Sequence, residues 1–308
     1  MSRDHPGDDA ETSPLVQIRS LLPGLARAEQ RVARAVLADP AAIARQSITE
    51  VAEAATTSET TVTRFCKAIG VGGYPDLRIA LAAEAARTTQ QDRALGGDIG
   101  PDDDVGAVVG KVAYADAKAV EETAGQLDRA VLQQLVEAVS AARRIDVYGV
   151  GASAFVALDL QQKLHRIGLT CFAWSDTHAA LTSAALLRSD DVAIGVSHTG
   201  ATAEVVEALR EADRRGATTA ALTNFARSPI TEVAGHVLTT AVRETAYRSG
   251  AMASRIGQLT AIDCLFIGVA QRDLDQTRQA LDATSRAVSE HRLGTRPDGR
   301  RQQQEEGR

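Results

Sequence analysis

The pattern that most constrains the fold is an alternation of short apolar runs with helix-like segments between residues 145 and 242. The apolar runs are 145–148, 170–174, 192–196, 219–223 and 237–242, and helix-like segments lie at 154–167, 177–187 and 205–215. Strands that alternate with helices form βαβ units, which assemble into a parallel sheet covered by helices on both faces. We therefore expect an α/β domain around a five-stranded, mostly parallel sheet.

The rest of the chain is helical or polar. Residues 15–87 have helical periodicity throughout, residues 88–104 are rich in Gly and Asp, and helix-like segments follow at 105–126, 129–142 and 254–289. We expect the following divisions: a disordered leader at 1–13, an all-helical head at 14–90, a linker and connecting helix at 91–127, the α/β domain at 128–272, and a C-terminal helix with a disordered tail at 273–308.

Composition limits the class of protein. The chain has 308 residues, enough for two domains. Its net charge of −6 argues against a protein whose whole surface is basic, but it is compatible with a local DNA-binding face. Cys66, Cys171 and Cys264 are isolated in apolar surroundings, so we expect buried thiols, no metal and no cofactor. No apolar run approaches the ~20 residues of a membrane span, and we expect a cytoplasmic protein.

A helix-turn-helix pattern lies within the head. Ser47 and Ser58 each precede a short amphipathic segment, with a break at Thr56 and Thr57 between them. The second segment has Val62, Phe65 and Ile69 at helical spacing and a polar face of Thr, Arg and Lys, the layout of a recognition helix that enters the DNA major groove. An ordinary two-helix corner with a solvated face is the alternative.

Local charge bears on how such a head would bind. Residues 58–87 hold four basic and three acidic side chains, a net charge of +1. Because phosphate neutralisation supplies much of the affinity for DNA, a monomer with so little charge would bind poorly. We expect a homodimer or homotetramer that holds several heads.

The head resembles the RpiR/MurR family of bacterial transcriptional regulators. The resemblance covers about the first 90 residues and rests on 25–33, 37–40, 47–55, 73–78 and Ser58-Glu59-Thr60-Thr61-Val62-Thr63-Arg64-Phe65-Cys66-Lys67. One departure is Thr56, where the family usually has glycine; a β-branched residue in a left-handed turn costs roughly 1 kcal/mol or more, so this turn either changes shape or is slightly destabilised. The residues expected to contact DNA are Ser58, Thr60, Thr61, Thr63, Arg64, Lys67 and Tyr74.

A hydroxyl-rich turn follows the apolar run 192–196 and leads into a helix-like segment. It reads Ser197-His198-Thr199-Gly200-Ala201-Thr202. Hydroxyls and free N–H groups at a strand-to-helix turn suit a phosphate, because the helix N-terminus adds unpaired donors and a favourable dipole, and Gly200 lets the backbone approach closely. We expect a phosphorylated ligand here.

A second glycine-rich turn, Gly149-Val150-Gly151-Ala152-Ser153, follows the run 145–148. It also fits a dinucleotide-binding fingerprint, with Asp176 roughly where that fold needs a ribose-binding acid. The phosphate-type turn on a different strand argues against the dinucleotide, which needs no second phosphate turn.

The pair of turns resembles the sugar isomerase (SIS) domain over about residues 128–272, with Thr199 in place of the family's usual second Ser. The segment 248–259 also resembles the RpiR family's version of this domain, in which it opens a helix near the ligand and the subunit interface. The resemblance implies a phosphosugar held by Gly151, Ser153, Ser197, Thr199, Gly200 and Thr202, and we add His198 and Glu244 as candidate ligand contacts.

Whether the ligand is transformed or sensed stays open at this point. SIS isomerases use a glutamate base with a His or Lys, for which Glu244, Glu204, His178 and His198 are candidates. A DNA-reading head favours sensing, so we expect a non-enzymatic transcriptional regulator modulated by a phosphosugar through the linker and connecting helix. The alternatives are a phosphosugar isomerase or lyase with a vestigial head, and a DNA-binding protein whose SIS domain only oligomerises.

Overall fold

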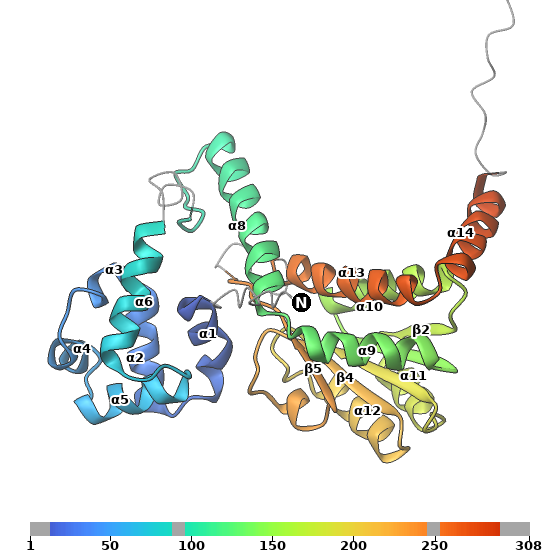
Figure 1. The fold of residues 1–308 in the computed structure, drawn as a ribbon, viewed down its shortest axis with the longest axis horizontal. Helices are drawn as coiled ribbons and strands as arrows, with labels where there is room; N and C mark the ends of the chain where they lie inside the picture. The colour runs from blue at the N-terminus through green and yellow to red at the C-terminus, as the bar shows by residue number, and fades with distance from the viewer. Residues whose placement is uncertain (1–12, 88–95, 245–252, 290–308) are drawn as a thin grey trace, which may run out of the picture.

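The computed structural model describes residues 13–87, 96–244 and 253–289. They form a helical head and an α/β domain, with the long helix α8 between the two (Figure 1). The predicted leader and tail, and parts of the predicted linker, lie outside the described residues.

Short helices build the head around one apolar core. They are α1 (Pro14–Leu21), α2 (Arg27–Ala38), α3 (Pro40–Ile43), α4 (Ile48–Ala54), α5 (Glu59–Ala68) and α6 (Tyr74–Arg87), with a 3-10 turn at Leu22–Gly24. Val32, Phe65 and Leu77 are fully buried at its centre. Ser58 caps α5 as the sequence predicts, and its hydroxyl accepts from the N–H group of Thr61; Ser47 caps α4 in the same way through the N–H group of Glu50.

The turn between α4 and α5 retains the left-handed backbone despite its threonine. Thr56 has a φ of +50°, the only positive φ of a non-glycine residue in the described ranges. Arg31 of α2 braces this turn, because its Nε donates to the carbonyl of Ala55 at 3.1 Å and its Nη2 to that of Thr56 at 2.9 Å. The turn keeps the shape that usually calls for glycine, and the side chain imposes strain there.

The α/β domain confirms the predicted sheet, which is parallel throughout. Its strands are β1 (Arg144–Gly149), β2 (Cys171–Trp174), β3 (Asp191–Val196), β4 (Thr218–Thr223) and β5 (His236–Thr239), in the order β2-β1-β3-β4-β5. The last strand is shorter than the predicted run 237–242. After Thr239 the N–H groups of Ala241 and Val242 donate to the side chains of Thr123 and Asn224 instead of to β4.

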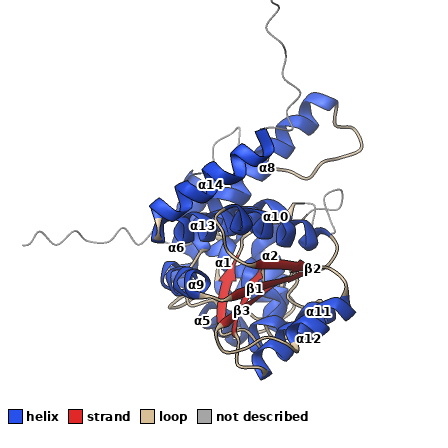
Figure 2. Cartoon of the chain, turned by 90° about the vertical axis from the view of Figure 1, so that its right-hand side faces the viewer, coloured by secondary structure: helices blue, strands red, loops and turns tan. Residues whose placement is uncertain are grey.

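Helices cover both faces of the sheet (Figure 2). One layer holds α9 (Arg129–Ala141), α10 (Ala152–Arg166) and α13 (Ser254–Arg272), and the other holds α11 (Thr177–Ala184) and α12 (Ala203–Arg214). A 3-10 turn at Pro229–Glu232 packs beside α12. The layers place the start of α10 and the start of α12 at one edge of the sheet, where β1 and β3 end.

Two further helices extend from this domain. The connecting helix α8 (Val105–Gln126) packs on α13, and α14 (Leu274–Ser289) follows a break at Asp273. Cys66 and Cys171 are buried as expected, whereas the expectation was wrong for Cys264, which lies on the exposed face of α13. Among the described helices, none combines the length and apolar character that crossing a membrane requires.

Candidate functional site: two hydroxyl-rich turns and a helical head

The two polar turns lie next to each other. β1 and β3 are neighbouring parallel strands, and Gly149 at the end of β1 pairs with Val196 at the end of β3. The residues after each strand therefore share the carboxyl edge of the sheet, where ligands of open α/β folds bind. Ser153 lies in the first turn of α10 and Ser197 directly follows β3; both are buried.

Hydrogen bonds hold the second turn in shape. Ser197 Oγ accepts from the N–H of Gly200 at 3.1 Å and lies 2.9 Å from Thr202 Oγ1, while Thr199 is exposed and its Oγ1 accepts from the N–H of Ala201. Gly200 is required here, because its φ is +64° and a Cβ would collide with Ser228. The hydroxyls of Ser197 and Thr202 thus face each other across a turn of fixed shape.

The helices that start at these turns lack side-chain caps. Gly151 and Thr202 occupy the N-cap positions of α10 and α12; Gly151 has no side chain to act as a cap, and that of Thr202 accepts no backbone N–H. By contrast, α9 is capped by Asp128 and α11 by Asp176. Two uncapped helix N-termini at one edge of the sheet offer unpaired N–H donors and positive dipole ends to an anion.

Asp176 has a structural partner. Its Oδ1 accepts from the N–H of Ala179 at 2.9 Å and caps α11. The acidic residue that a dinucleotide fingerprint would direct to a ribose is thus used within the fold, which weakens that alternative.

His198 and Glu244 form an electrostatically linked pair near the second turn. Burial lowers the pKa of His198 below its ordinary value, and the Glu244 carboxylate acts in the opposite direction. His198 Nδ1 and Glu244 Oε1 are both buried with no hydrogen-bond partner among the described residues. The two other candidate bases, Glu204 and His178, are exposed in the first turns of α12 and α11.

Two buried polar residues on α13 lie in the segment 248–259, but the sequence reasoning did not single them out as site residues. Ser254 and Gln258 are 0% exposed and have no hydrogen-bond partner among the described residues. A signal was present: at helical spacing they share a stripe with Ala261, Ile262 and Leu265, where only apolar residues are expected.

The head presents a polar face on α5. Ser58, Thr60, Arg64 and Lys67 are exposed and Thr63 is half-buried. Arg64 has a 62% exposed side chain and only a distant contact to Glu29, with 3.9 Å between Nε and Oε1.

Two of the residues predicted to contact DNA point into the head. Thr61 is buried and hydrogen bonded to Ser58, with 3.1 Å between the hydroxyls. Tyr74 is buried, and its hydroxyl lies within hydrogen-bond distance of the carbonyls of Ile43 and Gln46. Neither side chain lies on the exposed face of α5.

Hydrogen bonds connect the second turn to the ends of β4 and β5. The carbonyl of His198 accepts from the N–H of Asn224 at 3.0 Å and from Thr223 Oγ1 at 3.2 Å. Asn224 Oδ1 accepts from Thr240 Oγ1 and from the N–H of Val242 at 3.0 and 2.8 Å. The backbone of the turn and the chain after β5 therefore form one hydrogen-bonded unit.

The first helix of the head packs against that unit. Val16 and Arg19 of α1, together with Ser20, line one narrow gap with Glu122, Asn224, Thr240, Ala241 and Val242. Val16 is 3% exposed, and Arg19 Nη1 donates to Glu122 Oε2 of α8 at 3.1 Å. This contact between head and α/β domain was not predicted from the sequence, which pointed to the linker and connecting helix alone.

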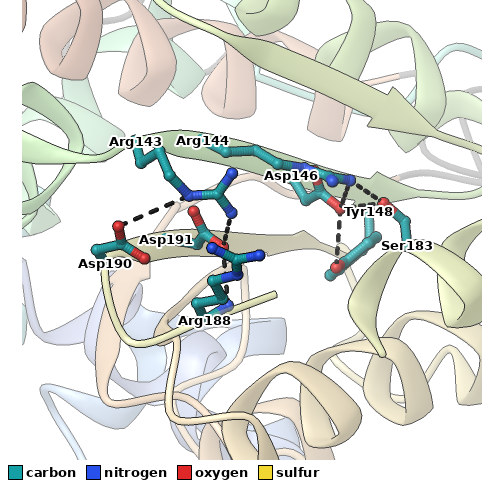
Figure 3. Close-up of polar contacts among 8 residues, drawn as sticks. All are labelled: Arg143, Arg144, Asp146, Tyr148, Ser183, Arg188, Asp190 and Asp191. Atoms are coloured by element: carbon teal, nitrogen blue, oxygen red, sulfur yellow. Dashed lines mark hydrogen bonds and ion pairs between the residues drawn. The ribbon is translucent and has the colours of Figure 1, made fainter. Parts of the chain in front are cut away.

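A second polar cluster lies at the opposite, amino edge of the sheet (Figure 3). Asp146 is fully buried and accepts from Arg144, Ser183 and Tyr148, while Arg143 pairs with Asp190 and Asp191. Its ion pairs and hydrogen bonds tie β1, β3 and α11 together, so we assign this cluster to the fold rather than to ligand binding.

Comparison with known proteins matches both parts of the chain. Residues 12–88 match the helix-turn-helix domain of the rpiR family, and residues 138–268 match the SIS domain. The chain is 40% identical to an uncharacterized HTH-type transcriptional regulator of Caldanaerobacter subterraneus subsp. tengcongensis, over 92% of this chain and 99% of that protein. It is 32% identical to the uncharacterized HTH-type transcriptional regulator YbbH of Bacillus subtilis, over 92% of this chain and 99% of that protein.

The chain is also similar to solved structures of this family. The Vibrio vulnificus NanR protein complexed with ManNAc-6P is 30% identical and superposes with a TM-score of 0.59, covering 91% of this chain and 100% of NanR. The sugar isomerase domain of an RpiR transcription factor from Sphaerobacter thermophilus is 29% identical, with a TM-score of 0.53, covering 57% of this chain and 97% of that one.

Proposed function

Because the chain belongs to the rpiR family of helix-turn-helix transcriptional regulators with a C-terminal SIS domain, we propose that it binds operator DNA under the control of a phosphosugar held at the carboxyl edge of its sheet. The observation that carries the proposal is the pairing of the glycine-rich turn at Gly151–Ser153 with the hydroxyl-rich turn at Ser197–Thr202, each opening an uncapped helix. The complex of the NanR relative with ManNAc-6P supports the choice of a phosphorylated sugar.

In this proposal the two turns hold the phosphate. The hydroxyls of Ser153, Ser197, Thr199 and Thr202 and the free N–H groups at the starts of α10 and α12 surround an anion. A phosphate would replace the contact between Ser197 and Thr202, whose hydroxyls now bond each other. Gly151 and Gly200 keep the backbone at the positive φ that brings the turns close.

The head would read DNA through the exposed face of α5. We assign contact to Ser58, Thr60, Thr63, Arg64 and Lys67, and a supporting role to Thr61 and Tyr74. Arg64 suits guanine edges in the major groove and Lys67 suits phosphate.

Two or more heads would act together, because the net charge of +1 around α5 gives one head little attraction for DNA. Phe155 and Leu158, one turn apart on α10, are 68% and 51% exposed and offer an apolar face for a second copy. Sedimentation of the purified protein checks this assembly.

Ligand control would pass through the hydrogen bonds from His198 to Asn224 and on to the chain after β5, against which α1 packs. A ligand shifts the heads only as far as its affinity differs between their two arrangements. Phosphate would bind at the turn that contains His198, so its affinity would depend on the arrangement of the heads.

Calorimetry tests the ligand site. We expect a sugar phosphate from a panel that includes N-acetylmannosamine 6-phosphate, glucose 6-phosphate and fructose 6-phosphate to release or absorb heat with wild type. The variant Ser197→Ala/Thr199→Ala should lose that signal while keeping its melting temperature within a few degrees. An absence of binding across the panel with wild type would favour a SIS domain that only oligomerises.

An isomerase or lyase is the second candidate, favoured by the linked pair of His198 and Glu244 at the site. A carboxylate beside an imidazole can move protons on a sugar phosphate. We propose that the pair binds ligand without turnover, in line with relatives that are named as regulators. Incubation with ketose and aldose phosphates decides: turnover abolished by Glu244→Gln would establish an enzyme.

A further inference from the structure

Gln258 of α13 is a polar side chain whose burial needs an explanation. It is 0% exposed, and neither its Oε1 nor its Nε2 has a hydrogen-bond partner among the described residues. Ser254, one turn earlier on the same face, is also 0% exposed with an unpartnered Oγ. Ala261, Ile262 and Leu265 continue this stripe with apolar side chains.

Such an arrangement is unfavourable unless something else binds there. A buried amide or hydroxyl without a partner loses its hydrogen bonds to water and receives nothing in return, and native proteins keep few such groups. A methionine or leucine would fill the place of Gln258 with no unpartnered atoms. The amide and the neighbouring hydroxyl are therefore suited to a partner that is not part of the chain.

The surroundings of α13 place both residues at the edge of the sheet that holds the hydroxyl-rich turns. A Cβ on Gly257 would touch Val242, Thr240 and Thr123, so this turn of α13 lies beyond Thr239, the end of β5. Figure 1 shows α13 beginning beside the end of α8 and the end of β5.

The next turn of α13 shows which end of this helix lies toward the carboxyl edge of the sheet. Ala261 and Ile262 belong to the same core cluster as Val196 and Leu222, at the ends of β3 and β4. Gln258 and Ser254 lie one and two turns nearer the helix start, at the level of the polar residues that follow those strands. His198 Nδ1 and Glu244 Oε1 supply two more buried, unpartnered polar atoms after β3 and β5.

We propose that Gln258 and Ser254 bind hydroxyl groups of the sugar part of the ligand and so set which phosphosugar the protein accepts. This assignment rests on the proposed function, since the phosphate turns anchor the same molecule. An amide that donates and accepts matches neighbouring hydroxyls, each of which also donates and accepts. The Glu244 carboxylate accepts hydrogen bonds from further hydroxyl groups and repels a second acidic group, so the ligand is the monophosphate of a neutral sugar.

The test compares Gln258→Met with wild type. Methionine keeps the length and volume of the side chain and removes both unpartnered atoms. We expect Gln258→Met without ligand to melt at or above the temperature of wild type, and to bind sugar phosphate at least tenfold more weakly. Its affinity for inorganic phosphate should stay within twofold of wild type, because the phosphate turns are untouched. Ser254→Ala should likewise weaken the affinity for sugar phosphate and leave the affinity for inorganic phosphate unchanged.

Gln271→Met is the matched control, since Gln271 is exposed near the other end of α13 and should bind every ligand like wild type. The probes are N-acetylmannosamine 6-phosphate, glucose 6-phosphate, fructose 6-phosphate and inorganic phosphate. Equal sugar-phosphate affinity in Gln258→Met and wild type would overturn the assignment and leave the proposed function standing. A Gln258→Met variant that melts well below wild type, or loses inorganic phosphate as well, would show a structural role and also overturn it. Wild type that binds no sugar phosphate would refute the proposed function, and this assignment with it.

Discussion

Arg19 of the head and Glu122 of α8 form an ion pair across 103 residues of sequence, with 3.1 Å between Nη1 and Oε2. Burial still raises the pKa of Glu122 above its ordinary value, even though Arg19 and Lys118 act to lower it. The contact between the head and the α/β domain therefore contains a carboxylate whose charge is only partly compensated. Such a contact can separate at modest cost, as a regulator that rearranges its heads requires.

Removal of Arg19 should weaken this contact. Arg19→Met leaves the Glu122 carboxylate without its partner, which costs the docked arrangement about 1–3 kcal/mol. We expect the effect of sugar phosphate on DNA affinity to shrink severalfold, while DNA affinity itself persists, because α5 is untouched.

Arg19→Met/Glu122→Gln is the control for that prediction. It removes the unpaired charge and should recover part of the ligand effect, a coupling that a double-mutant cycle measures. A full ligand effect in Arg19→Met would show that the pair takes no part in control.

Thr56→Gly should stabilise the head slightly. Glycine relieves the strain of a β-branched residue at a φ of +50°, roughly 1–2 kcal/mol, but loses about 0.5–1 kcal/mol in backbone entropy. The expected net gain is up to about 1 kcal/mol by chemical denaturation, with unchanged DNA affinity. A destabilised variant would show that the threonine side chain contributes favourably to this turn.

Lys67→Ala and Arg64→Ala should both weaken DNA binding, in different ways. Lys67→Ala should lower affinity for all sequences and reduce the slope of log affinity against log salt by about one, as the loss of one phosphate contact does. Arg64→Ala should cost about 1–3 kcal/mol and relax base preference at one position. Arg214→Ala, at the end of α12 in the α/β domain, removes one exposed positive charge and should leave both measurements unchanged. Full affinity in both α5 variants would refute the assignment of this helix.

Stability should fall in mildly acidic solution because of His198. Its pKa in the folded protein is lowered by burial, so the unfolded chain binds this proton more tightly. The contribution of neutral His198 is complete above the unfolded pKa of about 6.5 and declines as the pH falls below that value. Denaturation at pH 7.5, 6.5 and 5.5 should show a steeper loss for wild type than for His198→Gln. Parallel curves would mean that His198 is solvated, contrary to its buried Nδ1.

The parts predicted from sequence are those determined by local pattern. The alternation of apolar runs and helices predicted the parallel sheet, and the two turns directly follow β1 and β3, so both elements and their hydroxyls could be located without coordinates. On α5, Val62, Phe65 and Ile69 marked the buried face correctly. Thr61 lies four residues before Phe65 on that same face, and this spacing already excluded it from the exposed one.

The features that were missed depend on long-range packing. Gln258 interrupts an apolar stripe in the sequence, but that its amide is buried without a partner is seen only once α13 packs on the sheet. The docking of α1 brings together Arg19 and Glu122, which are 103 positions apart, and the periodicity of the sequence holds no information on such a distant pair. Tyr74 was predicted to contact DNA, yet its hydroxyl bonds to the carbonyls of Ile43 and Gln46 within the head.

The central claim is that a phosphosugar at the two turns changes how the head binds DNA. The most direct measurement is a fluorescence anisotropy titration of DNA selected by the protein from a random pool, with and without a sugar phosphate shown by calorimetry to bind. We predict a change of at least fivefold in Kd for wild type, and no change for Ser197→Ala, which should bind DNA like the ligand-free protein. An unchanged Kd for wild type with the sugar phosphate bound would contradict the account.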